Sequence, residues 1–178
     1  KPSIVELTQL AIHDIDPEYI EALGKDLFED LTMEEIMQGA IHDIDPDNIR
    51  AFHKMGYADL NFEEIVQYAI HDIDPEYIQS LVASGLNLSK DQIVQAGIHG
   101  VDADFVKRMS AVGYNNLQFN DIIEFGIHGV DADFIEELDE AGIKNLTKQQ
   151  IVNAAIHGLD ALDIVEFMAL DIEGLSFE

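Results

Sequence analysis

The segment LTMEEIMQGAIHDIDPDNIRAFHKMGYAD, residues 31–59, decides the fold because related copies of it fill the chain. Its Ile-His pair recurs at intervals of 28 or 29 residues, and an Asp follows each of these histidines three positions later. The repeated histidines are His13, His42, His71, His99, His128 and His157. A fixed period of this length is typical of a solenoid, in which each unit buries its apolar face against its neighbours.

Each copy has the pattern of two short helices. A capping residue precedes the first helix, and an acidic or amide residue follows it three positions later, as in a capping box. The capping residues are Ser3, Thr32, Asn61, Ser89, Gln118 and Thr147, of which only Gln118 is a poor N-cap. An N-cap Asp begins each second helix: Asp16, Asp45, Asp74, Asp102, Asp131 and Asp160. Gly56, Gly85, Gly113 and Gly142 stand where four of these helices would end in a left-handed residue.

These patterns predict an all-α protein, a right-handed α-α superhelix (α-solenoid) of six two-helix repeats that forms one domain over residues 1–178. The expected repeats span approximately residues 3–30, 31–59, 60–87, 88–116, 117–145 and 146–174. Residues 175–178 resemble the start of another first helix, so we expect a truncated seventh copy or a cap there. Because Lys1-Pro2-Ser3 opens directly into a repeat, we expect a processed or excised chain.

The chain is strongly acidic. It contains 36 Asp and Glu residues against 9 Lys and Arg residues, a formal charge of −27, and 47% of its residues are hydrophobic. This apolar content is sufficient for a substantial core. The charge repels nucleic-acid phosphates and anionic membranes and attracts cationic partners. No apolar run approaches the length of a membrane span, and no cysteine is present to form a disulfide or a thiolate metal site.

Catalytic motifs are missing from the sequence. It has no glycine-rich phosphate loop, and no Ser or Cys nucleophile with an organised base is indicated. Carboxylate pairs recur too regularly to mark one active site. We therefore predict a protein that is not an enzyme and that needs no cofactor.

The copies fall into two classes, His-Asp-Ile-Asp-Pro in the first three and His-Gly-Val-Asp-Ala or His-Gly-Leu-Asp-Ala in the last three. The second class, with Gly-Ile-His-Gly-Val-Asp-Ala-Asp-Phe and the later Gly-Tyr-Asn-Asn-Leu, resembles short helical repeats of bacterial proteins, some of them attached to membrane sensor-peptidases of the beta-lactam-sensor type. The resemblance covers nearly the whole chain and implies an interaction or sensing array. It transfers no peptidase activity, because the sequence has no His-Glu-x-x-His zinc motif.

The segment LTKQQIV, residues 146–152, which leads to His157-Gly158, resembles the first helix of transcription activator-like effector repeats. In that register His-Asp or His-Gly occupies the base-reading pair, which implies DNA reading. The Gly-Gly that follows the pair in that family is replaced here by Ile-Asp, Val-Asp or Leu-Asp, and the second helix is shorter. Because phosphate contacts dominate affinity for DNA, acidic turns and nine basic residues argue against a nucleic-acid partner.

The repeated histidines and N-cap aspartates, here called the His/Asp ladder, raise the question of a metal site. A transition metal holds its ligands at about 2 Å, whereas equivalent residues of neighbouring repeats start one helix-packing distance apart, about 8–10 Å. We therefore predict no metal site and a structural ladder, in which each histidine packs at the hairpin junction and hydrogen-bonds a neighbouring carbonyl or the following Asp. Weak calcium binding by Asp14, Asp16 and Glu18 is the alternative, without an EF-hand pattern to support it.

One position of the first helix varies among the copies, while the position before it stays polar. The varying residues are Leu10, Gly39, Tyr68, Ala96, Phe125 and Ala154, and the polar residues are Gln9, Gln38, Gln67, Gln95, Glu124 and Asn153. First helices often line the concave face of a solenoid, where extended binding surfaces form. We therefore predict partner contacts at Gln38, Gln67, Tyr68, Gln95, Glu124, Phe125 and Asn153. The alternative for the aromatic residues is that they fill gaps in an irregular core.

From these features we predict a monomeric, non-enzymatic scaffold that binds proteins or peptides and that favours basic partners through its acidic surface. Two alternatives remain open. One is a structural spacer or an engineered repeat protein without a specific ligand, in which the acidity serves only solubility. The other is a sequence-reading DNA-binding array.

Overall fold

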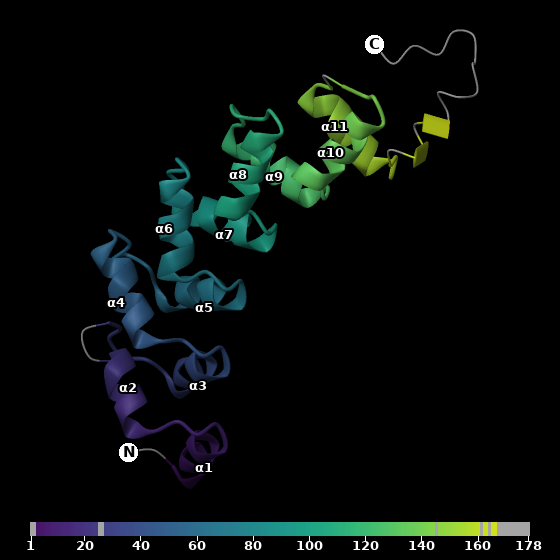
Figure 1. Ribbon diagram of the computed structural model, residues 1–178. Helices are drawn as coiled ribbons and strands as arrows, with labels where there is room; N and C mark the ends of the chain where they lie inside the picture. Colours follow the sequence, from purple (N-terminus) through teal and green to yellow (C-terminus); the bar gives the residue numbers. More distant parts are fainter. Residues whose placement is uncertain (1–2, 25–26, 145, 161, 164, 167–178) are drawn as a thin grey trace. The chain divides into compact units, whose positions relative to one another are not determined.

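The computed structural model describes residues 3–24, 27–144, 146–160, 162–163 and 165–166. Within these ranges it contains eleven α-helices and no β-strand, which confirms the predicted all-α architecture of two-helix repeats (Figure 1). The helices are α1 (Ile4–Ile12), α2 (Pro17–Gly24), α3 (Met33–Ile41), α4 (Pro46–Lys54), α5 (Phe62–Ile70), α6 (Pro75–Ala83), α7 (Lys90–Ile98), α8 (Ala103–Ala111), α9 (Phe119–Ile127), α10 (Ala132–Glu140) and α11 (Lys148–Ile156). The predictions for residues 1–2 and 175–178 lie outside the described residues, as does most of the expected second helix of repeat 6.

Contacts divide the chain into two compact units. Unit 1 comprises residues 1–79 and 89–97, and unit 2 comprises residues 80–88 and 98–178. Within unit 1, α3 packs against α5 and α2 packs against α4. Within unit 2, α8 packs against α10 and α9 packs against α11. In each unit, first helices therefore pack on first helices and second helices on second helices, as in stacked solenoid repeats.

The first helices are held at their N-termini by the predicted capping boxes. In repeat 2, the Thr32 hydroxyl accepts the Glu35 N–H at 3.2 Å, and the Glu35 carboxylate accepts the Thr32 N–H at 2.7 Å. Equivalent reciprocal bonds form at Ser3, Asn61, Ser89 and Thr147. At Gln118 only the Asp121 carboxylate accepts a bond, from the Gln118 N–H. Such caps matter because helices of eight or nine residues are marginal on their own.

The turn between the two helices of a repeat contains one left-handed residue after the histidine. Asp14, Asp43 and Asp72 have φ angles of 51° to 54° there, and the glycines at this position in repeats 4–6 have φ angles of 63° to 67°. The N–H of the next apolar residue returns to the variable position of the first helix, as from Ile44 to the Gly39 carbonyl at 2.8 Å. We did not predict this left-handed residue, although Asp and Gly are both residue types that tolerate the conformation.

Four second helices, α4, α6, α8 and α10, end as predicted at glycines with positive φ. At Gly56, φ is 101°, and the following Tyr57 N–H donates to the Phe52 carbonyl at 3.0 Å. Gly85, Gly113 and Gly142 have φ angles of 87° to 101° and the same pattern of bonds.

The variable position of the first helix lies in the core, and at the first two junctions between repeats its size complements that of its neighbour in the preceding repeat. A Cβ atom on Gly39 would lie only 2.8 Å from the Tyr19 hydroxyl, so Tyr19 fills the space that Gly39 leaves. In the next repeat the smaller Asn48 replaces the tyrosine and Tyr68 replaces the glycine, and the two residues line one pocket of about 300 Å³. In these two pairs a large residue is matched with a small one, as close-packed interiors require.

Among the described residues, no helix combines the length and the apolar character needed to cross a lipid bilayer.

Candidate functional site

The structure corrects the prediction that Tyr68 and Phe125 contact a partner. Their side chains are 1% and 0% exposed, respectively. The Tyr68 ring packs edge-on against Phe52 with centroids 5.3 Å apart, and the Phe125 ring packs against Tyr114 at 6.0 Å. Both rings thus fill the core, as the alternative interpretation holds. Burial also raises the pKa of Tyr68, and its hydroxyl has no hydrogen-bond partner within the described residues.

The polar position before each variable residue does face solvent. Gln9, Gln38, Gln67, Gln95 and Asn153 are exposed, and Glu124 is half-buried. In repeat 6 the amide of Gln149 donates to the Asn153 side chain at 3.1 Å, so Asn153 is already engaged. The other predicted polar contact residues thus remain accessible candidates.

An isoleucine that we did not assign to the site lies three residues after each of these polar residues. Residues three apart on a helix are neighbours on its surface, so each polar residue and its isoleucine form a pair. These isoleucines are 45% to 71% exposed, although isoleucine is among the residue types most often buried. They are Ile12, Ile41, Ile70, Ile98, Ile127 and Ile156. The signal in the sequence was the invariant Ile-His pair, which we used only to find the repeat.

The six histidines of the His/Asp ladder lie at the junctions between repeats. Each follows the last residue of a first helix, and at His42 the backbone N–H donates to the Gln38 carbonyl at 3.1 Å. A Cβ atom on Gly126 would lie 2.8 Å from the His99 carbonyl oxygen and 3.2 Å from its Cβ atom. His99 therefore packs against the next repeat, whereas His13 and His157 are exposed. The predicted side-chain hydrogen bonds are not present, because none of the six imidazoles forms one within the described part of the chain.

The aspartates of the ladder cap the second helices as predicted. The Asp16, Asp74, Asp102, Asp131 and Asp160 carboxylates accept the N–H three residues later at 2.6–2.9 Å. Asp45 accepts the Asp47 N–H at 2.8 Å. Across the described residues, no three His, Cys, Asp or Glu side chains converge in a way that could hold a metal ion. The aspartates act as backbone caps in this structure.

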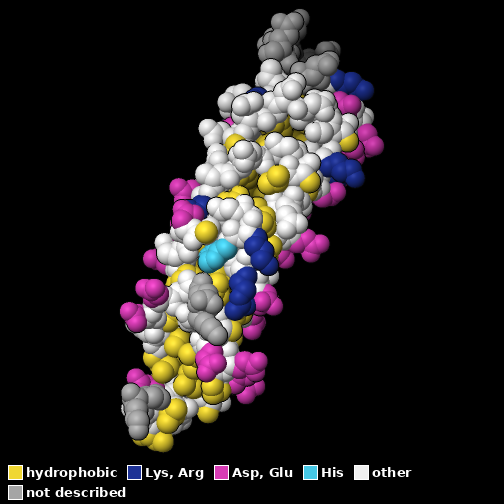
Figure 2. All heavy atoms as spheres, turned by 90° about the vertical axis from the view of Figure 1, so that its left-hand side faces the viewer, with side chains coloured by type: hydrophobic (Ala, Val, Ile, Leu, Met, Phe, Trp, Pro, Cys, Tyr) yellow, Lys and Arg dark blue, Asp and Glu magenta, His cyan; other side chains and the backbone are white. Residues whose placement is uncertain are grey.

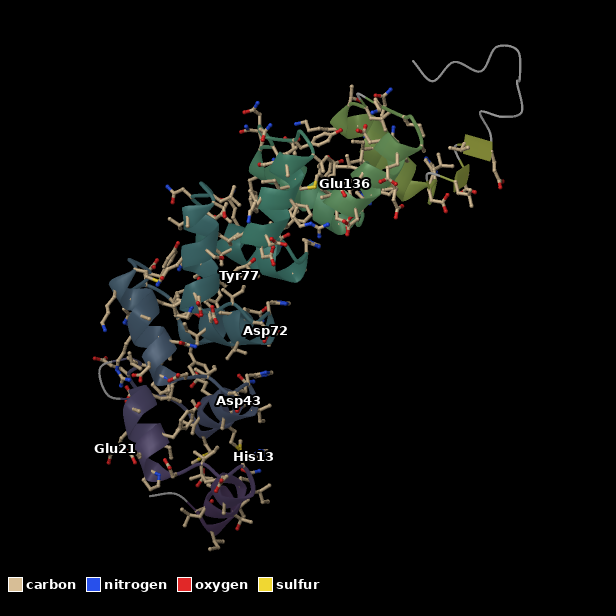
Figure 3. All side chains as sticks on the ribbon, in the orientation of Figure 1. His13, Glu21, Asp43, Asp72, Tyr77 and Glu136 are labelled. Atoms are coloured by element: carbon tan, nitrogen blue, oxygen red, sulfur yellow. The ribbon has the colours of Figure 1, made fainter. Side chains whose placement is uncertain are left out.

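Negative charge gathers at the ends of the first helices in unit 1. Asp14, Asp43 and Asp72 are exposed there and take part in no ion pair within the described residues. The carboxyl end of a helix carries a partial negative charge of its own. None of the six first helices has a basic residue in its last turn. Figure 3 shows Asp43 and Asp72 on the same side of unit 1 as His13, opposite Glu21 on α2.

Basic side chains lie on other parts of the repeats. Arg50 and Lys54 are on α4, and Lys107 and Arg108 are on α8. Figure 2, in which the left-hand side of Figure 1 faces the viewer, shows Lys and Arg side chains among acidic ones. Some cations form ion pairs between repeats, such as Arg108 with Asp133 and Lys148 with Asp121, and Arg50 pairs with Asp47 within α4. Within the described residues, none of these ion pairs involves Asp14, Asp43 or Asp72 at the first-helix ends.

Capping and ion pairing lower several carboxyl pKa values. Glu6, Glu35 and Glu64 have lowered pKa values, chiefly because each carboxylate accepts a backbone N–H of its N-cap residue. The Lys148 ammonium lowers the pKa of Asp121 by hydrogen bonding to its carboxylate. Burial, together with Asp43 and Asp45, raises the pKa of Tyr19 to about 12, so its hydroxyl remains a donor, to the Ile44 carbonyl at 3.2 Å. These groups support the fold, and none of them forms a catalytic pair.

Comparison with known proteins found no relative of this chain. No protein-family model matches the chain, and neither the curated proteins nor the solved structures contain a significant match. The class that the fold defines is a helical repeat protein built from two-helix units.

Proposed function

We propose that this chain is a non-enzymatic scaffold that binds protein or peptide partners, and that its acidic surface selects partners rich in Lys and Arg. The observation that carries the proposal is the uncompensated carboxylate at the end of each first helix in repeats 1–3, at Asp14, Asp43 and Asp72. These charges stand beside helix carboxyl ends, where a cation is favoured. An acidic surface of this kind accelerates and strengthens association with basic partners.

The same charges oppose the DNA-reading alternative. A DNA reader needs cations where phosphates approach, and it loses affinity steeply as salt displaces those contacts. In repeats 1–3 the turn that would face the bases carries an exposed aspartate, and the last turn of the preceding helix has no basic residue. These placements favour a cationic partner over a polyanion.

The test measures binding of the full chain to three labelled peptides of equal length, one rich in Lys, one rich in Glu and one uncharged, with duplex DNA as a fourth probe. We expect the Lys-rich peptide to bind at physiological salt and to weaken as salt rises, because screening acts on exposed charges. The Glu-rich peptide and DNA should not bind. If no basic peptide binds at physiological salt, or if DNA binds more tightly, the proposal is wrong.

A pair of charge variants then locates the attraction. Asp43→Asn with Asp72→Asn removes two charges at the turns, and asparagine still tolerates the left-handed conformation of these residues. Glu18→Gln with Glu21→Gln removes two charges from α2 instead, which makes the matched control. We expect the first pair to weaken binding of the Lys-rich peptide more than the second. Equal weakening by both pairs would show that only the net charge matters.

A further inference from the structure

In unit 1 the exposed amides and isoleucines of α1, α3 and α5 form a repeated surface. We call it the Gln-Ile ladder, and it consists of Gln9, Ile12, Gln38, Ile41, Gln67 and Ile70. Each helix contributes one amide and, three residues later, one isoleucine. The same pair of residue types therefore occurs in each of three consecutive repeats of the unit.

Packing within the protein does not account for these isoleucines. Ile12, Ile41 and Ile70 are 71%, 56% and 45% exposed, and each is the last residue of its helix. The core of the same helices is made by other residues, such as Ile36 in α3 and Ile65 in α5. The helix could form equally well with a polar residue at these positions, and that residue would expose less apolar surface to water. A single exposed isoleucine is ordinary, but a row of them at one repeated position indicates a contact surface.

Acidic groups border the ladder. Two residues after each isoleucine comes an exposed aspartate at positive φ, namely Asp14, Asp43 or Asp72. The ladder therefore combines apolar side chains and amides with a row of negative charges. A partner that complements all three must offer apolar groups, backbone or side-chain hydrogen-bonding groups, and positive charge.

We propose that the Gln-Ile ladder binds an extended basic segment of a partner protein in the polyproline II conformation, with an apolar side chain at every third position. This inference rests on the proposed function, because it names the surface and the kind of segment through which a basic partner would bind.

The spacing of every third side chain in a polyproline II segment matches the spacing expected between stacked repeats. Packed helices lie about 8–10 Å apart, which is the expected spacing of successive isoleucines. A polyproline II helix has three residues per turn and rises about 3.1 Å per residue, so side chains three residues apart share one face at about 9 Å. A β-strand would place such side chains on opposite faces, since its side chains alternate.

The amides of the Gln-Ile ladder can supply hydrogen-bond partners for the backbone of such a segment. A polyproline II backbone forms no internal hydrogen bonds, so its carbonyl oxygens need partners when water is displaced. Gln9, Gln38 and Gln67 are exposed, and each carries two N–H donors and one acceptor oxygen beside its isoleucine. An α-helical partner would have no free backbone groups for these amides. The repeated glutamines therefore favour an extended segment over a helix.

A second copy of this chain does not suit the ladder. It would place two rows of aspartates against each other, and like charges across an interface are costly. The chain as a whole carries a formal charge of −27, which also disfavours self-association.

The experiment uses the full chain and three synthetic peptides of identical composition made of Lys, Pro and Val. In the first, Lys-Pro-Val repeats so that valine recurs at every third residue; in the second, the order is scrambled to break this spacing. The third carries the first sequence with D-amino acids at alternate positions, which disrupts the polyproline II conformation. Dissociation constants are measured by fluorescence anisotropy at physiological salt. We expect the first peptide to bind at least about tenfold more tightly than the other two.

The protein variants are Ile41→Gln with Ile70→Gln in the ladder and, as a matched control, Val82→Gln on α6, where Val82 is 53% exposed outside the ladder. The ladder variant should weaken binding of the first peptide at least about tenfold, and the control should change it by less than about twofold. Both variants should keep the helical circular dichroism of the unaltered chain, because the replaced side chains are exposed. A variant of the amides, Gln38→Ala with Gln67→Ala, should weaken binding while leaving its salt dependence unchanged.

The outcomes separate this inference from the proposed function. If the three peptides bind equally and the ladder variant has no effect, the acidic scaffold stands and the Gln-Ile ladder is not its site. If the scrambled peptide binds as tightly as the first, the every-third-residue spacing is wrong. If none of the three basic peptides binds, both proposals fail.

Discussion

Repeats 1–3 and repeats 4–6 form the turn after the first helix with the same backbone and different residues. In the first three repeats the left-handed position is held by Asp at φ 51° to 54°, and in the last three by Gly at φ 63° to 67°. Glycine adopts this conformation without steric cost, whereas a residue with a Cβ atom does not. The fold therefore accepts glycine at the turn without needing aspartate. The aspartates, which cost conformational energy and add exposed charge, point to a role of the surface in repeats 1–3.

The largest expected effect tests whether the two regions depend equally on their cores. Tyr68→Ala in repeat 3 and Phe125→Ala in repeat 5 each remove a buried ring that packs against a second aromatic side chain. We expect each to lower the free energy of unfolding by about 3–5 kcal/mol, measured by urea denaturation. Gln67→Ala and Glu124→Ala, one residue earlier in each helix, are the controls and should change it by less than about 1 kcal/mol. A loss below that level at Tyr68 or Phe125 would contradict their place in the core.

A smaller effect tests the left-handed turn in repeats 4–6. Gly129 has φ 67°, and within the described residues no atom beyond its two chain neighbours lies within 4 Å of the position that a Cβ atom would occupy. Gly129→Val therefore meets no clash, and its cost comes from the backbone alone, about 2 kcal/mol of unfolding free energy. Ile127→Val introduces the same residue two positions earlier, inside α9, and should cost less than about 1 kcal/mol. Equal costs in the two variants would argue against backbone strain.

Exchanging the residues of the two turn classes gives a still smaller effect with opposite signs. Gly129→Asp should destabilise the chain by about 1 kcal/mol, because aspartate tolerates positive φ less well than glycine. Asp43→Gly should stabilise it by about 0.5 kcal/mol, since relief of strain and of charge repulsion outweighs the greater freedom of glycine in the unfolded chain. Thermal and urea denaturation of both variants check the signs. Two changes of the same sign would refute this account of the turn.

The smallest effect concerns how the two regions respond to acid. Glu35 caps α3 with a carboxylate, while Gln92 and Gln150 cap α7 and α11 with amides that do not titrate. The pKa of Glu35 is lowered from its ordinary value of 4.5, so its stabilisation is complete above that value and is lost as pH falls through the lowered pKa.

Glu35→Gln should therefore make the stability of the chain fall less steeply with acid below about pH 4.5. Gln150→Glu makes the reciprocal change and should steepen it, as measured by thermal melting over a series of pH values. If the melting temperatures of the unaltered chain and of both variants changed in parallel with pH, the charge of the capping carboxylate would contribute nothing to stability.

Much of the fold was predictable because each repeat contains residues that mark where its helices begin and end. Thr32 and Glu35 predicted a capping box, Asp45 predicted the start of α4, and Gly56 predicted its end, and the structure confirms all three. These signals are local, since each involves residues within one helical turn. The left-handed Asp43 was missed, because a single Asp between two helices has no signature until its φ angle is known.

The candidate site was less predictable, because exposure depends on neighbouring repeats. Tyr68 and Gln67 are adjacent in sequence, yet Tyr68 is buried and Gln67 is exposed. Only the position of Asn48 and Phe52 on the preceding second helix decides which of the two faces solvent. Ile41 was overlooked for the opposite reason, since an isoleucine in a helix is usually a core residue. Helical periodicity alone does not distinguish a face covered by a neighbour from one that stays open.

The matched pairs at the first two junctions also constrain the order of repeats 1–3. Tyr19 lies against Gly39, and Asn48 lies beside Tyr68. Removing repeat 2 would bring Tyr19 to the place of Asn48, next to Tyr68, and two large side chains would compete for the room of one. Repeats 1–3 look alike in sequence, but they are therefore not interchangeable in the chain. Loss of repeat 2 would have to be accompanied by a second substitution across the new junction, which constrains how this part of the array can shorten.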